Sequence, residues 1–431
     1  MAATLAHQPA PNPPGAEGSR LAAVPRGMPI LFGGDRVTYV PDAVATAFRP
    51  GDHLIVVQST GDVLLIPGET VSAVDRAVQR ARAAFEALAP LPDERIDRFY
   101  ERFSLALADD GVWGRIAAAN AGDVTRARAR GRSTTRLVAD AGMRSKMIEG
   151  LRLWRDLPTR REAVQGTVQH QGWRVQEVVS GVGVIGFVFE GRPNVLADAT
   201  GVLRSGNTAV MRIGSDALGT ARAIVAEALD PALRQAELPP GAVTLIDRPD
   251  RAAGWALFAN NGLALAVARG SGAAVAQLGA VARQAGTPVS LHGSGGGWIL
   301  ADATALPQAL ASAVYHSLDS KKCNTLNTLC IVEGTAERLV PVALDALQRR
   351  GAALGHGYKL HVTLGATRYV PAGLFATRTG VRRAEGEVWE PIAEGIGEED
   401  LGREWEWEGT PEITLTVVPE VDDAVRLFNR Y

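Results

Sequence analysis

The chain has 431 residues, of which 46% are hydrophobic and 21% charged, and its formal net charge is −2. A chain of this length is expected to fold into two or three domains with sizeable cores. The near-neutral charge, without a basic stripe interleaved with aromatic residues, argues against a nucleic-acid partner. No apolar run approaches the length of a membrane span and no signal-peptide pattern opens the sequence, so we expect a cytoplasmic protein without membrane contact.

The first part of the chain predicts a tail, a hairpin and a series of helices. Residues 1–28 are rich in Pro and Ala and are expected to form a flexible tail. Residues 29–69 carry two apolar runs separated by a Ser-Thr-Gly-Asp turn, which is typical of a β-hairpin. A helical period begins at Val71 and closes before Pro90, and further helices extend to about residue 157.

A second hairpin and a repeated strand–helix rhythm follow. Residues at about 163–178 alternate in polarity, which predicts a two-stranded ribbon. Buried apolar strands then alternate with helices, and this order predicts a parallel, doubly wound sheet that binds a dinucleotide at its carboxyl ends. We therefore expect an NAD(P)-binding domain over residues 29–287. Its strands are expected at 182–189, 208–212, 242–247 and 263–268.

The remaining residues, 288–431, predict a second α/β domain. Its two cysteines, Cys323 and Cys330, stand seven residues apart on an expected turn and strand, so the sequence predicts neither a disulfide framework nor a metal site. The expected strands are at 298–300, 359–363 and 413–418, and the expected helices are one that ends near 317, one at 336–350 and one that begins at 421.

Cys323 is the candidate nucleophile. It follows Lys321 and Lys322 and precedes small polar residues, a setting that favours the thiolate, whereas Cys330 stands in an apolar run and is expected to be a small buried side chain. A thiolate is well suited to attack an acyl phosphate or an aldehyde carbonyl and to form a thioester.

The segment from Cys323 to Cys330 resembles the nucleophile segment of the gamma-glutamyl phosphate reductases, also called glutamate-5-semialdehyde dehydrogenases, a branch of the aldehyde dehydrogenase superfamily. Further similar stretches occur in the same order over about residues 75–431. They are Asn120-Ala121-Gly122-Asp123-Val124, Gly183-Val184-Ile185-Gly186, Arg192-Pro193-Asn194-Val195, Ser205-Gly206-Asn207, Leu238-Pro239-Pro240-Gly241 and Arg269-Gly270-Ser271-Gly272.

The resemblance implies an aldehyde dehydrogenase-like fold and a reaction. The fold would combine a doubly wound cofactor-binding sheet, an α/β catalytic domain with Cys323, and a hairpin at 163–178 that projects toward a partner subunit in a homo-oligomer. The reaction would be the NADPH-dependent reduction of L-glutamyl 5-phosphate to L-glutamate 5-semialdehyde and phosphate, in proline biosynthesis. Cys323 would form the thioester, and the backbone N–H groups of Cys323 and Asn324 would hold the oxyanion.

The expected substrate contacts are Arg192, Asn194 and His292. Arg is a natural bidentate partner of phosphate, although a surface arginine in a turn is the alternative for Arg192. The Glu that general aldehyde dehydrogenases keep as a general base falls on Leu291, a loss that resemblance to the reductase branch implies, and His292 beside it is either an acid or phosphate contact or a simple loop histidine.

The expected cofactor contacts lie after two strands. Arg212, Ser215 and Asp216 would meet the adenosine ribose and its 2′-phosphate, and an Arg at this strand end favours NADP over NAD. Gly270, Ser271 and Gly272 would place a helix N-terminus at the pyrophosphate, with a structural turn as the alternative.

Two departures from the family pattern leave other functions open. Residues 1–70 extend beyond the usual start of these reductases, and the chain ends at Tyr431, before the strands that normally follow, so the catalytic domain is expected to lack its usual C-terminal end. The alternatives are therefore a related enzyme acting on another acyl phosphate or aldehyde in a specialised pathway, and a non-catalytic paralogue.

Overall fold

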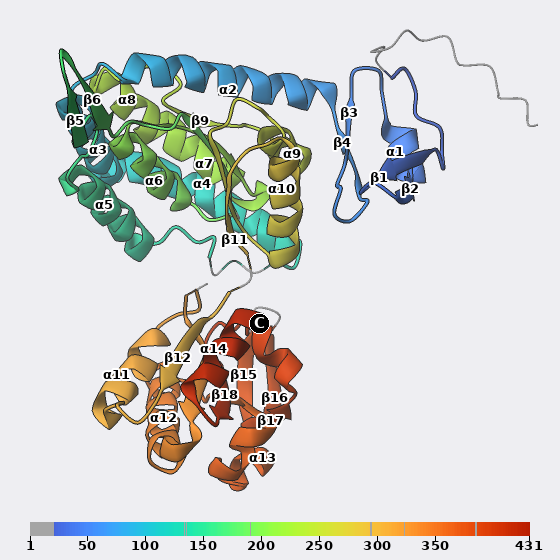
Figure 1. The fold of residues 1–431 in the computed structure, drawn as a ribbon, viewed down its shortest axis with the longest axis vertical. Coiled ribbons are helices and arrows are strands. Elements are labelled where there is room, and N and C mark those ends of the chain that lie inside the picture. The colour runs from blue at the N-terminus through green and yellow to red at the C-terminus, as the bar shows by residue number, and fades with distance from the viewer. Residues whose placement is uncertain are drawn as a thin grey trace, which may run out of the picture.

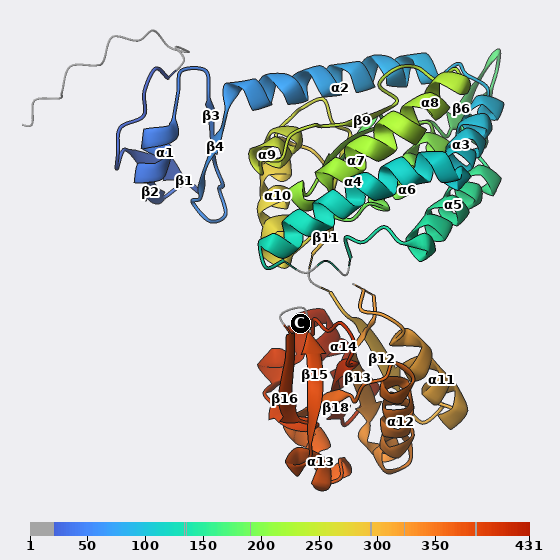
Figure 2. The same cartoon turned by 180° about the vertical axis from the view of Figure 1, so that it is seen from behind.

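The computed structural model of the chain describes residues 21–132, 134, 136–189, 191–293, 295–322, 324–383 and 386–431. Figure 1 and the reverse view in Figure 2 show two bodies joined by a short connection, and an N-terminal arm that reaches the larger body through the long helix α2 (Gly68–Leu88). The C-terminus lies in the smaller body.

The larger body contains a five-stranded, fully parallel sheet in the order β11-β10-β7-β8-β9. Its strands are β7 (Val184–Phe189), β8 (Thr208–Ile213), β9 (Val243–Leu245), β10 (Leu265–Arg269) and β11 (Val289–His292). Alternate side chains of the central strand β7 enter two different cores: Ile185, Phe187 and Phe189 enter one, and Val184 and Val188 the other. Because both faces of β7 are covered, nearly all of its residues are apolar, and the strand appears in the sequence as a continuous apolar run.

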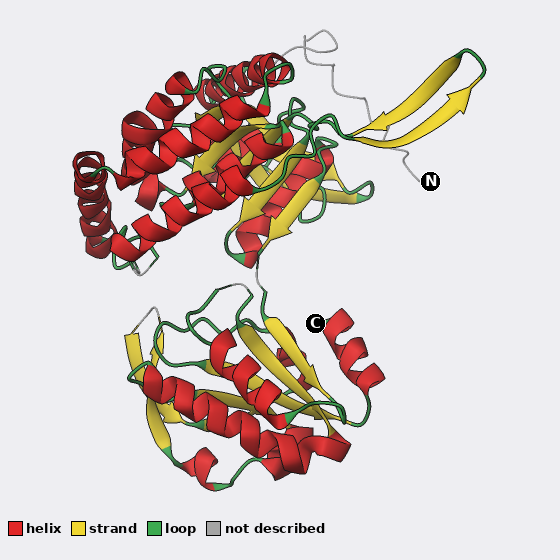
Figure 3. Cartoon of the chain, turned by 90° about the vertical axis from the view of Figure 1, so that its left-hand side faces the viewer, coloured by secondary structure: helices red, strands yellow, loops and turns green. Residues whose placement is uncertain are grey.

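Helices cover both faces of this sheet, as Figure 3 shows in red against the yellow strands. One core combines the sheet with α3 to α8, and the other combines it with α2, α9 and α10. The helices besides α2 are α3 (Asp93–Ala108), α4 (Asp110–Ala129), α5 (Ala141–Asp156), α6 (Val195–Ala199), α7 (Leu218–Ile224), α8 (Asp230–Gln235), α9 (Ala252–Phe258) and α10 (Gly272–Gln284), with the short turns η1 (Thr200–Ser205), η2 (Ser215–Ala217) and η3 (Val225–Leu229).

The smaller body contains a second parallel sheet in the order β12-β13-β18-β14-β17. Its strands are β12 (Gly297–Ala301), β13 (Leu326–Val332), β14 (Lys359–Thr363), β17 (Ala393–Ile396) and β18 (Glu412–Val418). Its helices are α11 (Pro307–Ser317), α12 (Glu333–Ala353), α13 (Gly373–Ala376) and α14 (Val421–Arg430), with η4 (Leu364–Tyr369) and η5 (Glu398–Gly402). The aldehyde dehydrogenase-like arrangement predicted from the sequence, two α/β bodies with parallel sheets, is thus present.

Among the residues that the structure describes, four antiparallel strand pairs lie outside the two sheets. The expected hairpins are β3 (His53–Val56) with β4 (Val63–Ile66), and β5 (Val164–His170) with β6 (Trp173–Val178). The sequence did not predict β1 (Pro29–Phe32) with β2 (Arg36–Tyr39), helix α1 (Asp42–Ala47), or β15 (Arg378–Arg383) with β16 (Gly386–Pro391). These strands are short or rich in Arg and Gly, which carry little strand propensity.

Two predicted boundaries are corrected. The second domain was expected to begin near Pro288, but β11 pairs with β10 in the first sheet, so the change of sheet falls between His292 and Gly297. The expected tail, residues 1–28, lies outside the described residues up to residue 20. Val24, however, is buried with Val40 and Phe48, because the arm forms a small apolar cluster of its own.

A network of buried charges joins the β15–β16 hairpin to the second sheet. The Arg383 guanidinium donates to the carboxylates of both Glu390 and Glu412. The side chain of Lys359 is fully buried and pairs with Glu394 at 2.8 Å. His361, from β14, lies between carboxylates of β17 and β18, so hydrogen bonds and ion pairs link three strands and the hairpin. The members of the network are Lys359, His361, Arg383, Glu390, Glu394 and Glu412.

These contacts shift the pKa values of the carboxyl groups. The hydrogen bond from Arg383 lowers the pKa of Glu390 below its ordinary value of 4.5. Burial alone would raise the pKa of Glu412, but hydrogen bonds from His361 and Arg383 lower it below its ordinary value. A depressed carboxyl pKa contributes stability that is present above the ordinary pKa and is lost as the pH falls through the folded-state pKa.

We predict that Arg383→Met lowers the free energy of unfolding by about 3 kcal/mol at neutral pH, because it leaves the buried carboxylate of Glu412 poorly compensated. The neighbouring exposed residue supplies the control, and Arg382→Met should change this free energy by no more than about 0.5 kcal/mol. Urea unfolding measures both. Between about pH 5 and pH 3 the unmodified protein should lose more stability than Arg383→Met; equal losses would contradict the assignment.

Candidate active site

The site predicted from the sequence falls where the two sheets approach each other. β11 ends at His292 and β12 begins at Gly297, and both sheets are parallel. The short connection therefore places the carboxyl edge of the first sheet near the amino edge of the second. Figure 3 shows the two bodies linked by this single segment. In a doubly wound sheet the carboxyl edge is where ligands bind.

The segment after β7 carries two of the expected substrate contacts, Arg192 and Asn194. Asn194 precedes helix α6, and its amide group donates to Asp198 Oδ2 at 3.2 Å. Burial raises the pKa of Asp198 above its ordinary value, although the positive charge of Arg269 acts in the opposite direction. Asn194 therefore precedes a short helix, and its side chain is bound to a carboxylate in the first turn of that helix.

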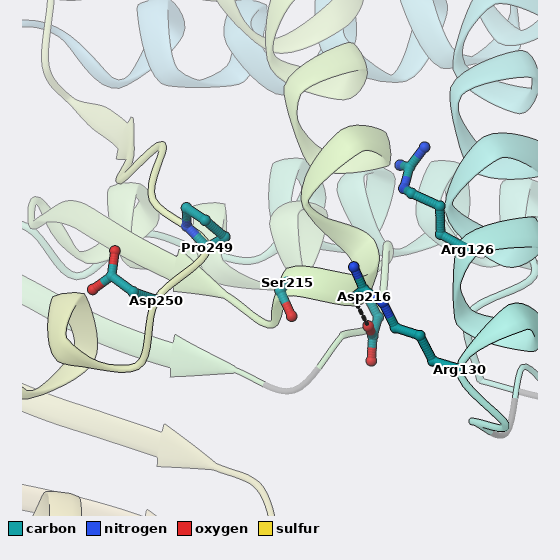
Figure 4. Close-up of a pocket in the computed structure, with 6 residues that line it drawn as sticks. All are labelled: Arg126, Arg130, Ser215, Asp216, Pro249 and Asp250. Atoms are coloured by element: carbon teal, nitrogen blue, oxygen red, sulfur yellow. Dashed lines mark ion pairs between the residues drawn. The ribbon is translucent and has the colours of Figure 1, made fainter. Parts of the chain in front are cut away.

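The segment after β8 borders a pocket of about 350 Å³, drawn in Figure 4. Ser215 and Asp216 were both expected here. Asp216 forms ion pairs with Arg130 and Arg132, although its Oδ1 atom is buried without a hydrogen-bond partner among the described residues. The residues that line the pocket are Arg126, Arg130, Ser215, Asp216, Pro249 and Asp250.

Arg212 does not line this pocket. Its Nη2 atom donates to the backbone carbonyls of Pro249 and Asp250, each at 3.1 Å, and burial lowers its pKa. Its guanidinium thus binds the β9–α9 loop, which forms one wall of the pocket, because that loop offers two carbonyl acceptors to a strand-end arginine. The contact of Arg212 with a 2′-phosphate stays a prediction.

The sequence pattern did not predict Arg126 and Arg130 as site residues. Arg126 lies in the last turn of α4 and Arg130 is the C-cap residue directly after it, so the two lie at the same end of the helix. Both arginines are visible in the sequence, but α4 lies about ninety residues before Asp216, and only the packing of α4 against α7 brings them together.

The turn after β10 has the arrangement expected for a phosphate contact. Gly270 and Ser271 connect β10 to helix α10, which begins at Gly272. The Gly270 N–H donates to the backbone oxygen of His292 at 3.1 Å, so this turn is bound to the end of β11. Ser271 is the N-cap, and its side chain makes no capping hydrogen bond within the described residues, which leaves the N–H groups of the first turn open.

His292 ends β11 beside this turn. Its Nε2 atom lies 3.1 Å from Ser290 Oγ, and the ring is exposed. Leu291, expected from the sequence to align with the general base of general aldehyde dehydrogenases, packs closely on Gly279 of α10.

Across the connection, the nucleophile segment leads into β13. Cys323 itself lies outside the described residues, but its neighbours are tightly held. The Thr325 hydroxyl accepts from the Lys322 N–H at 2.8 Å and donates to the Ser320 carbonyl at 2.9 Å. The Thr325 carbonyl accepts from the Gly297 N–H at 2.7 Å. Asn324 therefore follows Cys323 into a closed loop anchored at the connection between the sheets.

The two lysines beside Cys323 are not free positive charges. Lys321 forms a buried ion pair with Glu404, and Lys322 lies 3.5 Å from Asp319. The expectation that both ammonium groups favour the thiolate is therefore weakened, because each is compensated by a carboxylate. Glu404 was not identified from the sequence, since it lies far along the chain.

Comparison with known proteins agrees with this geometry. The sequence model of the aldehyde dehydrogenase family matches residues 57–369, well over half of the chain. This chain belongs to the aldehyde dehydrogenase family. The resemblance seen in the sequence is therefore confirmed, and the family is one of oxidoreductases that use nicotinamide cofactors.

The similar relatives point to one branch of the family. The chain is 33% identical over 296 residues to a gamma-glutamyl phosphate reductase of Bradyrhizobium diazoefficiens, covering 66% of each protein. It is 34% identical over 291 residues to one of Xanthomonas axonopodis pv. citri, covering 64% of this chain and 67% of that one. The match thus spans about two thirds of the relatives' length.

Solved structures share the fold. A gamma-glutamyl phosphate reductase from Thermotoga maritima superposes with a TM-score of 0.68 at 24% identity, covering 83% of this chain and 80% of that one. An aldehyde dehydrogenase from Brucella melitensis biovar abortus gives a TM-score of 0.56 at 16% identity, covering 94% and 82%. Among the described residues, no helix has the length and apolar character to cross a membrane.

We predict that iodoacetamide labels Cys323 of the folded protein well before Cys330. Cys330 is fully buried in β13, and burial raises the pKa of its thiol to about 12, so both access and ionisation oppose its reaction. Peptide mass spectrometry after timed labelling near pH 8 measures both sites, and the urea-unfolded chain serves as the control. Labelling of Cys330 at the unfolded rate in the folded protein would contradict its buried position.

Proposed function

We propose that this chain reduces L-glutamyl 5-phosphate to L-glutamate 5-semialdehyde and phosphate with NADPH, a step of proline biosynthesis in the cytoplasm. The observation that carries the proposal is the similarity, at 33–34% identity, to proteins named gamma-glutamyl phosphate reductase. The polar residues gathered at the facing sheet edges support it.

In this proposal Cys323 attacks the acyl carbon of the substrate, the carbon–oxygen bond to phosphate breaks, and a thioester forms. The backbone N–H groups at Cys323 and Asn324 stabilise the negative oxygen during attack. Arg192, Asn194 and His292, at the opposite edge, bind the departing phosphate. When the thioester has been reduced to the aldehyde level, the carbon–sulfur bond breaks and the thiolate is regenerated.

NADPH supplies the hydride for this reduction. The described residues fit such a cofactor, because two arginines line the pocket beside Ser215 and supply positive charge for a phosphate. In the proposal Arg126 and Arg130 bind the 2′-phosphate, and Arg212 keeps the Pro249–Asp250 wall in place. Gly270, Ser271 and Gly272 bind the pyrophosphate with open N–H groups of α10.

Leu291 favours reduction over oxidation to a free acid. Hydrolysis of a thioester needs a base to activate water. The position that aligns with the general base of other aldehyde dehydrogenases carries Leu291, an apolar side chain packed on Gly279. The thioester is thus reserved for exchange with hydride or phosphate.

We predict that glutamate 5-semialdehyde and NADP give NADPH only when phosphate is present, followed by NADPH absorbance. Cys323→Ala should abolish this turnover, whereas Cys330→Ala should retain most of it, because only Cys323 forms the thioester. Turnover without phosphate would point to a hydrolytic dehydrogenase. Faster turnover with another aldehyde would assign the chain to a different substrate, and no turnover with any aldehyde tested would favour a non-catalytic paralogue.

We predict that Arg130→Ala weakens NADPH binding about tenfold or more while leaving NADH nearly unchanged, since a charge-assisted contact is worth roughly 1.5–3 kcal/mol. Arg128→Ala is the matched control, because it lies on the same helix but does not line the pocket. Arg212→Ala should weaken both cofactors alike. Fluorescence titration measures the dissociation constants, and a uniform effect of Arg130→Ala on both cofactors would refute the assignment.

A further inference from the structure

One carboxylate touches both segments that meet at the candidate site. Glu404 forms an ion pair with Lys321, and the two side chains are only 12% and 4% exposed. The other carboxylate oxygen of Glu404 accepts a hydrogen bond from the Gly295 N–H at 2.7 Å. Lys321 precedes Cys323 by two residues, and Gly295 lies in the connection between the two sheets.

The backbone around Glu404 is itself fixed. The Asn327 side chain accepts from the Trp405 N–H and donates to the Arg403 carbonyl, both at 2.9 Å. Trp405 is buried, stacks on His361 at 3.5 Å, and donates from its ring nitrogen to Thr414. Arg403 and Trp405, on either side of Glu404, are both bonded to the second sheet. The backbone of Glu404 therefore cannot shift to accompany a movement of Lys321.

Burial makes this arrangement demanding. An ammonium group and a carboxylate out of water must stay paired, because separation would leave two uncompensated charges in a poorly solvated site. Lys321 can keep its partner only while the nucleophile loop stays against Glu404, and the Gly295 contact imposes the same condition on the connection.

We propose that Glu404 is a positioning residue that fixes Cys323 relative to the carboxyl edge of the cofactor sheet, through Lys321 on one side and Gly295 on the other. The proposal rests on the proposed function only in taking Cys323 as the nucleophile. Two residues further on, Glu406 provides a contrast, since its ion pair with Arg136 is 55% and 39% exposed and is expected to contribute little.

The test compares Glu404→Gln with Glu406→Gln, both in a Cys330→Ala background so that one thiol reports. The first readout is the rate of Cys323 alkylation by iodoacetamide at high pH, where the rate no longer depends on pH and reports access alone. The second is the division between kcat and KM for NADPH. Glu404→Gln should change the limiting alkylation rate at least threefold and lower kcat about ten- to a hundredfold, with KM nearly unchanged. Glu406→Gln should leave all three values within about twofold.

Two other outcomes would contradict the proposal. An unchanged limiting alkylation rate would overturn the proposal, and a rise in KM for NADPH alone would make Glu404 a ligand contact instead. If Glu404→Gln lowers the thermal unfolding midpoint too far, Glu404→Asp keeps the charge but is too short to reach both partners, and the same changes are expected in smaller measure. The alkylation readout needs no reductase activity, so failure of the proposed function leaves it interpretable.

Discussion

The short connection between β11 and β12 is the constraint on which the site depends. Parallel strands all run in one direction, so the chain leaves the first sheet at its carboxyl edge and must enter the second at its amino edge. With only residues 293–296 between them, these two edges cannot lie far apart. The Gly295 bond to Glu404 lies within this connection, and the Gly270 bond to His292 and the Gly297 bond to Thr325 lie at its two ends. A cofactor edge and a nucleophile loop are thereby brought together by chain length as much as by side-chain contacts.

The parts of the fold that could be predicted from the sequence are the strands whose burial is visible as a local run of apolar residues. Val184–Phe189 shows a continuous apolar run because both faces are covered, and Lys359–Thr363 and Glu412–Val418 could be located in the same way. The β15–β16 hairpin could not, because its strands are joined to the sheet by Arg and Glu side chains, which read as a solvated surface. Trp405 and Trp407 stand among glutamates in the sequence, yet both tryptophans are buried, while the neighbouring Glu404 and Glu406 form ion pairs.

The candidate site followed the same division. Ser215, Asp216 and the Gly270–Gly272 turn follow strands of a parallel sheet, so topology alone placed them at the binding edge. Arg212 occupied an equally suitable position, but whether a strand-end arginine faces a ligand or a neighbouring carbonyl depends on a loop conformation that the sequence does not reveal. Motif membership had the same limit: Asn120 and Asp123 of α4 are buried and bond to Thr220 of α7, so they join two helices and do not reach a substrate.

The buried charge network has a consequence for how the smaller body can be altered. Arg383 and Glu390 belong to the β15–β16 hairpin, whereas Lys359 and Glu412 belong to the sheet that the hairpin covers. Within the sheet Lys359 keeps Glu394 as a partner and Glu412 keeps His361, but without the hairpin Lys359 would lose Glu390 and Glu412 would lose Arg383, so each buried group would be less well compensated. The hairpin is therefore not an independent surface element. An insertion or deletion in it would disturb buried ion pairs. Shortening it to a loop would require that Lys359 and Glu412 first be replaced by apolar residues.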